Sequence, residues 1–355
     1  MASAILAKCH FFTKETNRMK VSKTVPFITI LAIWLVILTP SWSGQWETLQ
    51  PVGDFDFFSV AFISATEGFA VGSDPFEYEK PGAIGHTTDG GKTWKKVDNV
   101  AFESDLKSVF FVNEKNGWAV GANGLIVATD DGGKTWDLQT SKVGNGLSCV
   151  SFVDTKIGFI GGEGETILKT TNGGRTWKVL TGGQAASGFG DDDTSVFSAI
   201  HFADANTGYV AGVRITPSNQ GQETLIQKTT DGGQTWVKQP TNTEDILEDM
   251  YFINGTTGWA VGENGVIFTT TDGNSWKALD SGSEEKLRSV RFVSANTGWA
   301  VGGDMGVNVI LQTEDGGTTW TEQSSGKLFA YDVFSLDANN VWIAGQNAII
   351  MKYTK

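Results

Sequence analysis

The chain has 355 residues, of which 40 are acidic and 27 basic, so its formal charge at neutral pH is −13. Such an acidic surface repels nucleic acid and anionic membranes, and it does not suit a binder of polyanions unless a local basic patch exists. With two cysteines and three histidines, the sequence also excludes a disulfide framework and a cluster of zinc ligands.

Residues 1–43 carry the features of an export signal. Three basic residues between positions 18 and 23 precede the apolar run Val25–Leu38, and small residues at 41 and 43 favour cleavage before Gly44. The apolar run is short for a membrane-spanning helix of roughly 20 residues, so an uncleaved anchor is the alternative. Met19 offers a second start, which would leave residues 1–18 untranslated. We therefore expect an exported protein.

Cleavage would change both the charge and the cysteine count. It would remove five basic residues and one acidic residue, and so lower the formal charge from −13 to −17. Cys149 would be the one cysteine left, inside the apolar run Leu147–Phe152. A buried and unreactive thiol is the expected role, because no second cysteine would remain to pair with it.

The octapeptide Thr-Thr-Asp-Gly-Gly-Lys-Thr-Trp at 87–94 is repeated along the chain. Close copies lie at 129–136, 170–177, 229–236 and 313–320, and a shortened copy lies at 270–276. Glycine supplies the positive φ of a tight turn, Asp and Thr can bond nearby amides, and Trp has a large face to bury. We interpret each copy as a structural β-hairpin, and not as a loop for Ca²⁺ or sugar, because repeat architectures require identical turns. The defining residues are Asp89, Trp94, Asp131, Trp136, Asn172, Trp177, Asp231, Trp236, Asp272, Trp276, Asp315 and Trp320.

A second pattern, Gly-aromatic-(Ala/Val/Ile)-x-Gly, counts the repeating units. It occurs six times between 68–72 and 298–302, and a seventh copy at 341–345 lacks the first Gly. Each copy follows a short apolar run such as Leu106–Phe111, and strand-forming residues predominate without helical periodicity. One unit therefore contains four strands, with the octapeptide turn between the third and the fourth.

Seven such patterns against six turns leave the last unit without a fourth strand. Residues Trp46–Gln50 resemble the strand that follows each turn. An N-terminal strand that completes the last unit would close a ring and remove two exposed sheet edges. The sequence therefore predicts an all-β fold: a single domain over residues 44–355, built as a seven-bladed β-propeller of four-stranded antiparallel blades and closed by the N-terminal strand.

Three insertions, Ser73–Gly82, Gly182–Thr194 and Val213–Glu223, interrupt the repeats. Propeller topology assigns all three to the face opposite the octapeptide turns, and insertions gathered on one face mark its binding side. Tolerated variation of surface loops is the alternative. The run Asp191–Asp193 has the carboxylates that Ca²⁺ prefers, but a charged loop is the simpler interpretation. We expect no metal and no cofactor.

The innermost strands share the pattern Leu-x-Ser-Val-x-Phe, whose x positions packing does not explain. Charged residues near the axis are costly unless they face water, so these positions are expected to line a wet channel. The first x, nearer to the insertions, is assigned to Phe58, Lys107, Ser148, Ser198, Glu248, Arg288 and Asp332, and the second to Ala61, Phe110, Ser151, His201, Tyr251, Arg291 and Ser335. A solvated ring of charges without function is the alternative. The candidate ligand or partner site consists of Lys107, His201, Glu248, Tyr251, Arg288, Arg291 and Asp332.

The octapeptide resembles the Asp-box, or BNR repeat, of sialidases, sortilin-type receptors and related β-propellers, over nearly all of the chain after residue 43. A sialidase also needs three arginines that clamp a carboxylate, and a Tyr–Glu pair. Four arginines follow residue 43, and Arg175 lies inside a turn on the wrong face. Glu248 and Asp332 are a candidate carboxylate pair for another type of glycosidase, at a separation that the sequence does not fix. We expect a protein that is not an enzyme.

The whole layout is most similar to the photosystem II stability/assembly factor family, in its length, export signal and seven Asp-box blades without catalysis. The resemblance implies a protein of the periplasm or thylakoid lumen that holds a membrane-protein partner, or its precursor, during assembly. Photosynthetic members have an Arg-rich patch, whereas this chain is acidic and poor in arginine, so photosystem II is the narrower expectation. The alternative is an extracellular propeller that binds or hydrolyses glycans. We expect a monomer that does not bind nucleic acid.

Overall fold

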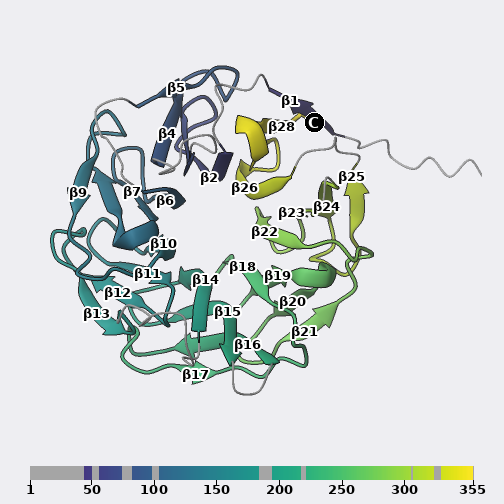
Figure 1. Cartoon of the computed structure of the whole chain (residues 1–355). Coiled ribbons are helices and arrows are strands. Elements are labelled where there is room, and N and C mark those ends of the chain that lie inside the picture. The colour runs from purple at the N-terminus through teal and green to yellow at the C-terminus, as the bar shows by residue number, and fades with distance from the viewer. Residues whose placement is uncertain are drawn as a thin grey trace, which may run out of the picture. The chain divides into compact units, whose positions relative to one another are not determined.

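The computed structural model describes residues 44–49, 56–73, 82–97, 104–183, 194–216, 221–304, 307–323 and 329–354. The signal proposed for residues 1–43, the run Asp191–Asp193 and much of the three insertions lie outside these residues. Within the described part, seven four-stranded antiparallel sheets follow one another along the chain, and Figure 1 shows them around a central axis. The predicted all-β, seven-bladed propeller is confirmed.

Each of the first six blades runs from its inner to its outer strand in chain order. Blades 1 to 3 are β2 (Asp56–Phe62), β3 (Gly68–Ser73), β4 (Gly82–Thr87) and β5 (Lys95–Lys96); β6 (Leu106–Phe111), β7 (Gly117–Gly121), β8 (Ile126–Thr129) and β9 (Asp137–Gln139); β10 (Leu147–Phe152), β11 (Gly158–Gly162), β12 (Ile167–Thr170) and β13 (Lys178–Thr181). Blades 4 to 6 are β14 (Thr194–Phe202), β15 (Gly208–Thr216), β16 (Gly221–Thr229) and β17 (Val237–Lys238); β18 (Leu247–Phe252), β19 (Gly258–Gly262), β20 (Ile267–Thr270) and β21 (Lys277–Leu279); β22 (Leu287–Phe292), β23 (Gly298–Gly302), β24 (Val309–Thr313) and β25 (Thr321–Gln323). Short 3₁₀ turns η1 (Ala122–Gly124), η2 (Glu263–Gly265) and η3 (Gln346–Ala348) link second to third strands. No helix among the described residues has the length and apolar character needed to cross a bilayer.

Blade 7 is assembled from both ends of the chain. It contains β26 (Ala330–Asp337), β27 (Asn340–Gly345), β28 (Ile350–Thr354) and, as its outer strand, β1 (Gln45–Thr48), which lies beside β28 in Figure 1. The antiparallel register pairs Trp46 with Tyr353, and the two rings lie 5.3 Å apart between centroids. Beyond the strand, the Leu49 N–H donates to the carbonyl oxygen of Ile350 at 2.8 Å. The predicted closure by the N-terminal strand is confirmed.

The Asp-box turns are held by the side chains that define the motif. In blade 2 the Asp131 carboxylate accepts hydrogen bonds from the Thr135 N–H (3.0 Å), the Thr135 hydroxyl (2.7 Å) and the Thr129 hydroxyl (2.9 Å). The Thr129 oxygen in turn accepts the Gly133 N–H at 2.8 Å. Asn172 stands in place of Asp in blade 3 and keeps the bonds through both atoms of its amide. These bonds of the Asp or Asn and the two Thr lie inside the turn, as a structural hairpin requires.

Aromatic residues join neighbouring blades. Trp118 of β7 stacks on Phe152 of β10 with ring centroids 3.4 Å apart. Across the seam between blades 7 and 1, Trp342 stacks in the same way on Phe62 at 3.7 Å, and its Nε1 donates to the Gly90 carbonyl oxygen at 3.0 Å. The hydrophobic clusters likewise combine residues of adjacent blades. The core therefore lies between blades, so each blade depends on its neighbours for burial.

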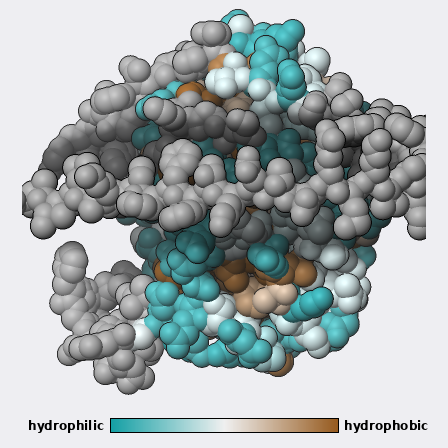
Figure 2. All heavy atoms as spheres, turned by 90° about the vertical axis from the view of Figure 1, so that its right-hand side faces the viewer, coloured by the Kyte–Doolittle hydropathy of each residue, from teal (hydrophilic) through white to brown (hydrophobic). Residues whose placement is uncertain are grey.

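The outer surface is mainly polar. On the side of the propeller that Figure 2 shows, hydrophilic residues predominate over the coloured surface, and hydrophobic residues form small groups among them. The large hydrophobic side chains that are most exposed in the described residues, Leu138 and Val237, belong to the outer strands of two different blades. Single exposed apolar residues of this kind are ordinary on protein surfaces.

Candidate binding cavity

Every inner strand carries a β-bulge near its start. In blade 6, Leu287 pairs with Gly302 and Ser289 pairs with Val301, so Arg288 has no residue opposite it. The same shift recurs in the other six inner strands. A bulge sets two residues against one and redirects a side chain. Residues at the first x and at the position after it therefore line one axial cavity of about 470 Å³.

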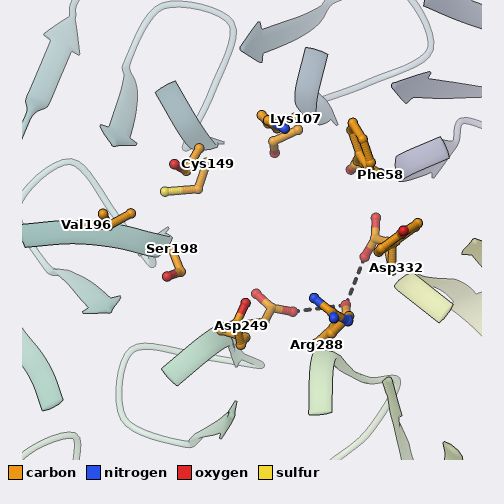
Figure 3. Close-up of a pocket in the computed structure, with 14 residues that line it drawn as sticks. Phe58, Lys107, Cys149, Val196, Ser198, Asp249, Arg288 and Asp332 are labelled. Carbon is orange, nitrogen blue, oxygen red and sulfur yellow. Dashed lines mark hydrogen bonds between the residues drawn. The ribbon is translucent and has the colours of Figure 1, made fainter. Parts of the chain in front are cut away.

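Four residues, one from each inner strand of blades 2, 1, 7 and 6, form a continuous row of cations and rings on this wall. They are Lys107, Phe58, Tyr331 and Arg288. The Lys107 ammonium lies 4.4 Å from the centre of the Phe58 ring, which meets Tyr331 edge to face at 5.4 Å. The Arg288 guanidinium lies 5.6 Å from the centre of the Tyr331 ring. Figure 3 shows Lys107, Phe58 and Arg288 around the same opening. We call these four residues the cation–aromatic row.

The charged groups beside the row differ in how far they are already paired. Lys107 Nζ lies 2.6 Å from the carboxylate of Asp105, and Glu248 lies 2.5 Å from Lys286 Nζ. By contrast, the Nε of Arg288 is buried and has no hydrogen-bond partner among the described residues. Arg288 therefore has an unsatisfied donor in this wall, whereas the Glu248 carboxylate is already paired with its lysine.

A second row lies deeper, at the second x positions of blades 4 to 7. His201 meets Tyr251 with ring centroids 6.1 Å apart, and the Arg291 guanidinium lies 4.8 Å from the Tyr251 ring and 5.1 Å from the Phe334 ring. Removal from water, assisted by the nearby Arg291, lowers the pKa of His201 to about 4. His201 is therefore neutral at neutral pH, and Arg291 supplies the positive charge of this level.

The residues at the Ser position of the pattern bind the next blade. In four blades a side-chain oxygen at this position accepts the inner-edge N–H of the following inner strand, namely an oxygen of Ser59, Asp249, Ser289 or Asp332. Asp249 accepts the Val290 N–H at 3.0 Å, and Asp332 accepts the Val60 N–H at 2.9 Å across the seam. These residues face the cavity and also tie the ring together.

The structure brings all seven predicted site residues to the axis, at two levels. Lys107, Glu248, Arg288 and Asp332 line the upper cavity. His201, Tyr251 and Arg291 line a smaller cavity of about 120 Å³ that Asp332 also borders. Their part in binding stays a prediction.

The register predicted for the last inner strand is wrong by one residue. Ala330 pairs with Gly345 and so takes the Leu position, which places Tyr331 at the first x and Asp332 at the Ser position. Phe334, and not Ser335, therefore takes the second x.

Sequence reasoning also missed Asp249. It stands where the pattern has Ser, and the pattern alone does not show that the bulge turns this position toward the channel. An Asp in place of Ser on a buried strand was the available signal.

Comparison with known proteins places this architecture. The sequence model described as "Photosynthesis system II assembly factor YCF48" matches residues 97–188, 139–240 and 273–355. The solved structure titled "YCF48 bound to D1 peptide" is 20% identical, with a TM-score of 0.66 and coverage of 87% of this chain and 97% of that one. YCF48 from Cyanidioschyzon merolae is 19% identical, with a TM-score of 0.64 over 87% of this chain and 98% of that one. No curated protein matches the sequence.

An enzyme shares the fold at a greater distance. The GH74 enzyme of Niastella koreensis is 14% identical, with a TM-score of 0.61 over 86% of this chain and 53% of that one. Likeness at this level of identity shows the fold alone.

The fold and cavity define a seven-bladed Asp-box propeller with a polar and aromatic cavity on its axis. Within that class, the chain belongs to the family of the photosystem II assembly factor YCF48, whose model matches well over half of it. It is thus a propeller of the assembly-factor type.

Proposed function

We propose that this chain is an exported, non-catalytic assembly factor that holds a segment of a membrane-protein partner, or of its precursor, against the cation–aromatic row. The row is the observation that carries the proposal, because rings with adjacent cations bind peptide side chains and carboxylates in a desolvated pocket. Arg288 contributes a buried Nε without a partner in the described residues. Membership of the YCF48 family supports an assembly role.

The narrower proposal is that the partner is the D1 protein of photosystem II or its precursor. One structural relative was solved with a D1 peptide bound. The overall charge of this chain is acidic, so recognition of an acidic peptide would depend on the local cations of the row. Lys107 and Arg288 therefore become the residues to test.

The carboxylates of the cavity favour binding over hydrolysis. A glycosidase needs two carboxyl groups that are free to act on a sugar. Glu248 is paired with Lys286, while Asp332 accepts an amide N–H and contacts the Ser289 hydroxyl. The pair proposed from the sequence is therefore engaged in the ring itself. A glycan that stacks on Phe58 and Tyr331 is the second candidate ligand, because flat rings suit both peptides and sugars.

The test is a titration with a fluorescent D1 peptide, followed by anisotropy. The binding variant carries Lys107→Glu and Arg288→Glu. The control carries Lys178→Glu and Lys277→Glu, which reverse two exposed charges on outer strands and give the same net charge. We expect binding by the intact chain and the control, and at least tenfold weaker binding by the binding variant, where each tenfold is ~1.4 kcal/mol.

Equal affinity of the two variants would overturn the assignment to the row. Failure of the D1 peptide to bind any form would overturn the D1 proposal. Saturable binding of an oligosaccharide in its place would favour the glycan alternative. Export has its own test: the N-terminus of the native protein should be Gly44, and recovery of an N-terminus at Met1 or Met19 would contradict cleavage.

A further inference from the structure

One hydroxyl lies between two carboxyl groups at the level between the two rows. Ser289 Oγ lies 3.0 Å from Asp249 Oδ2 and 2.8 Å from Asp332 Oδ1. The three residues come from β18, β22 and β26, the inner strands of three consecutive blades. Figure 3 shows Asp249 and Asp332 joined to this point by dashed lines. The contact thus bridges blades 5, 6 and 7.

The hydrogen count of this bridge is fixed by its chemistry. A serine hydroxyl has one proton to donate, and its oxygen has two lone pairs. Ser289 Oγ already accepts the Val333 N–H at 3.2 Å, which leaves it one donation and one further acceptance. It can donate to one carboxylate only, so the second contact is a hydrogen bond only if that carboxyl group brings its own proton.

We propose that Asp249 and Asp332 share one proton through Ser289, so that the bridge is a pH-sensitive latch between blades 5, 6 and 7. In the closed latch one carboxyl donates to Ser289 Oγ, and Ser289 donates to the other carboxylate. With both groups ionised, one oxygen–oxygen contact loses its proton and two negative charges face each other across one hydroxyl. The latch then opens, and the charge of the cavity changes by one.

The surroundings of the bridge favour its protonated form. The charged and titratable groups around the bridge are Arg288 and Arg291 on β22, Glu248 and Tyr251 on β18, His201 on β14, Cys149 on β10, Lys107 on β6 and Tyr331 on β26. Removal from water raises the pKa of both carboxyl groups, and the positive charge of Arg291 opposes this at each of them. Asp249 reaches a pKa of about 6.

The same two residues hold the inner edges of the ring, which links the latch to stability. Asp249 binds the Val290 N–H of the next blade, and Asp332 binds the Val60 N–H of blade 1. A carboxyl whose pKa is about 6 when folded and ~3.9 when unfolded takes up a proton on folding between these values. The latch therefore stabilises the protein most near pH 4, and this contribution is lost as the pH rises through 6.

The experiment compares the thermal midpoint of the intact chain with that of Asp249→Asn from pH 4.5 to pH 7.5. The amide copies the shape of the protonated carboxyl but does not titrate. The thermal midpoint of the intact chain, relative to that of Asp249→Asn, should fall by about 3 °C as the pH rises across this range. The control is Ser148→Ala, at a residue of the same cavity that has no titrating group, for which no such pH-dependent difference is expected.

A second measurement follows the carboxyl carbons directly by NMR in the intact chain and in Ser289→Ala. In the intact chain, Asp249 should titrate near pH 6, and Asp332 above the usual range of an aspartate. Without the bridging hydroxyl, the midpoint of Asp249 should move. Midpoints of both carboxyl groups at or below pH 4, or a midpoint difference from Asp249→Asn that does not depend on pH, would overturn the latch. Both measurements use the protein alone, so their outcome is independent of whether it binds a D1 peptide.

Discussion

Deletion of residues 45–49 from the full chain should destabilise the whole ring, because this segment is the outer strand of blade 7. Its four residue pairs with β28 imply about four backbone hydrogen bonds, each worth ~1 kcal/mol. Leu49 is only 6% exposed, and burial of such a side chain contributes about 2 kcal/mol. The expected loss is therefore about 6 kcal/mol, a large share of the roughly 5–15 kcal/mol by which domains are stable.

The assay is urea unfolding followed by tryptophan fluorescence, with the free energy of unfolding extrapolated to water. Leu49→Ala gives a graded version of the same perturbation and should cost about 2–3 kcal/mol. The control is Leu138→Ser, also on an outer strand but 66% exposed, which should cost less than ~0.5 kcal/mol. If the deletion lowered the free energy of unfolding by less than about 1 kcal/mol, the closure of the ring by β1 would not matter for stability, and the reasoning would fail.

Three further outcomes concern single groups. Asp131→Asn should lower the free energy of unfolding in urea by less than ~0.5 kcal/mol, because Asn172 already performs the same role in blade 3. Asp131→Ala should lower it by about 2 kcal/mol, because the donors of Thr129 and Thr135 lose their acceptor. Hydrogen bonds from Thr or Ser and neighbouring amides lower the pKa of Asp231 and Asp272 to about 2, so the stability that these carboxylates give above pH 4 should be lost as the pH falls toward 2; a thermal midpoint that holds constant there would contradict this. Burial raises the pKa of the Cys149 thiol, so a thiol reagent should label it in denaturant and not in the native protein, and rapid native labelling would show the thiol to be accessible.

The number of blades and their closure could be predicted because each unit carries two strong local signals. The Asp-box requires glycines at positive φ, and Gly132 and Gly133 have φ of 77° and 78°. The Gly-aromatic pattern marks each second strand, and Trp342 shows why: the ring stacks on the neighbouring blade and its N–H finds a carbonyl there. Seven Gly-aromatic patterns and six Asp-boxes indicate that the last blade lacks a fourth strand, and the strand at Trp46 supplies it.

The cavity could be predicted only in part, because its shape depends on contacts between blades. The x positions can be aligned from blade to blade in the sequence, and this alignment predicts that Lys107 and Arg288 line the axis. The bulge that also turns Asp249 into the channel is a property of strand pairing, and the sequence pattern does not show it. In the last blade, Ala330 and Ser335 stand where other blades have large apolar residues. The sequence pattern therefore places its first position at Tyr331, one residue too late.

The cation–aromatic row spans the seam where the ring closes, so a ligand bound to the row would be coupled to closure. Phe58 of blade 1 meets Tyr331 of blade 7 at 5.4 Å, beside the hydrogen bond from the Val60 N–H to Asp332. Blades 7 and 1 are held together by these contacts, by Trp342 and by the pairing of β1 with β28. A ligand that lies along the row contacts both blades at once and binds only the closed ring, so it stabilises closure by mass action. Amide hydrogens of β1 and β28 should therefore exchange more slowly when the cavity is occupied, although neither strand lines it, and unchanged exchange at saturating ligand would show that binding and closure are independent.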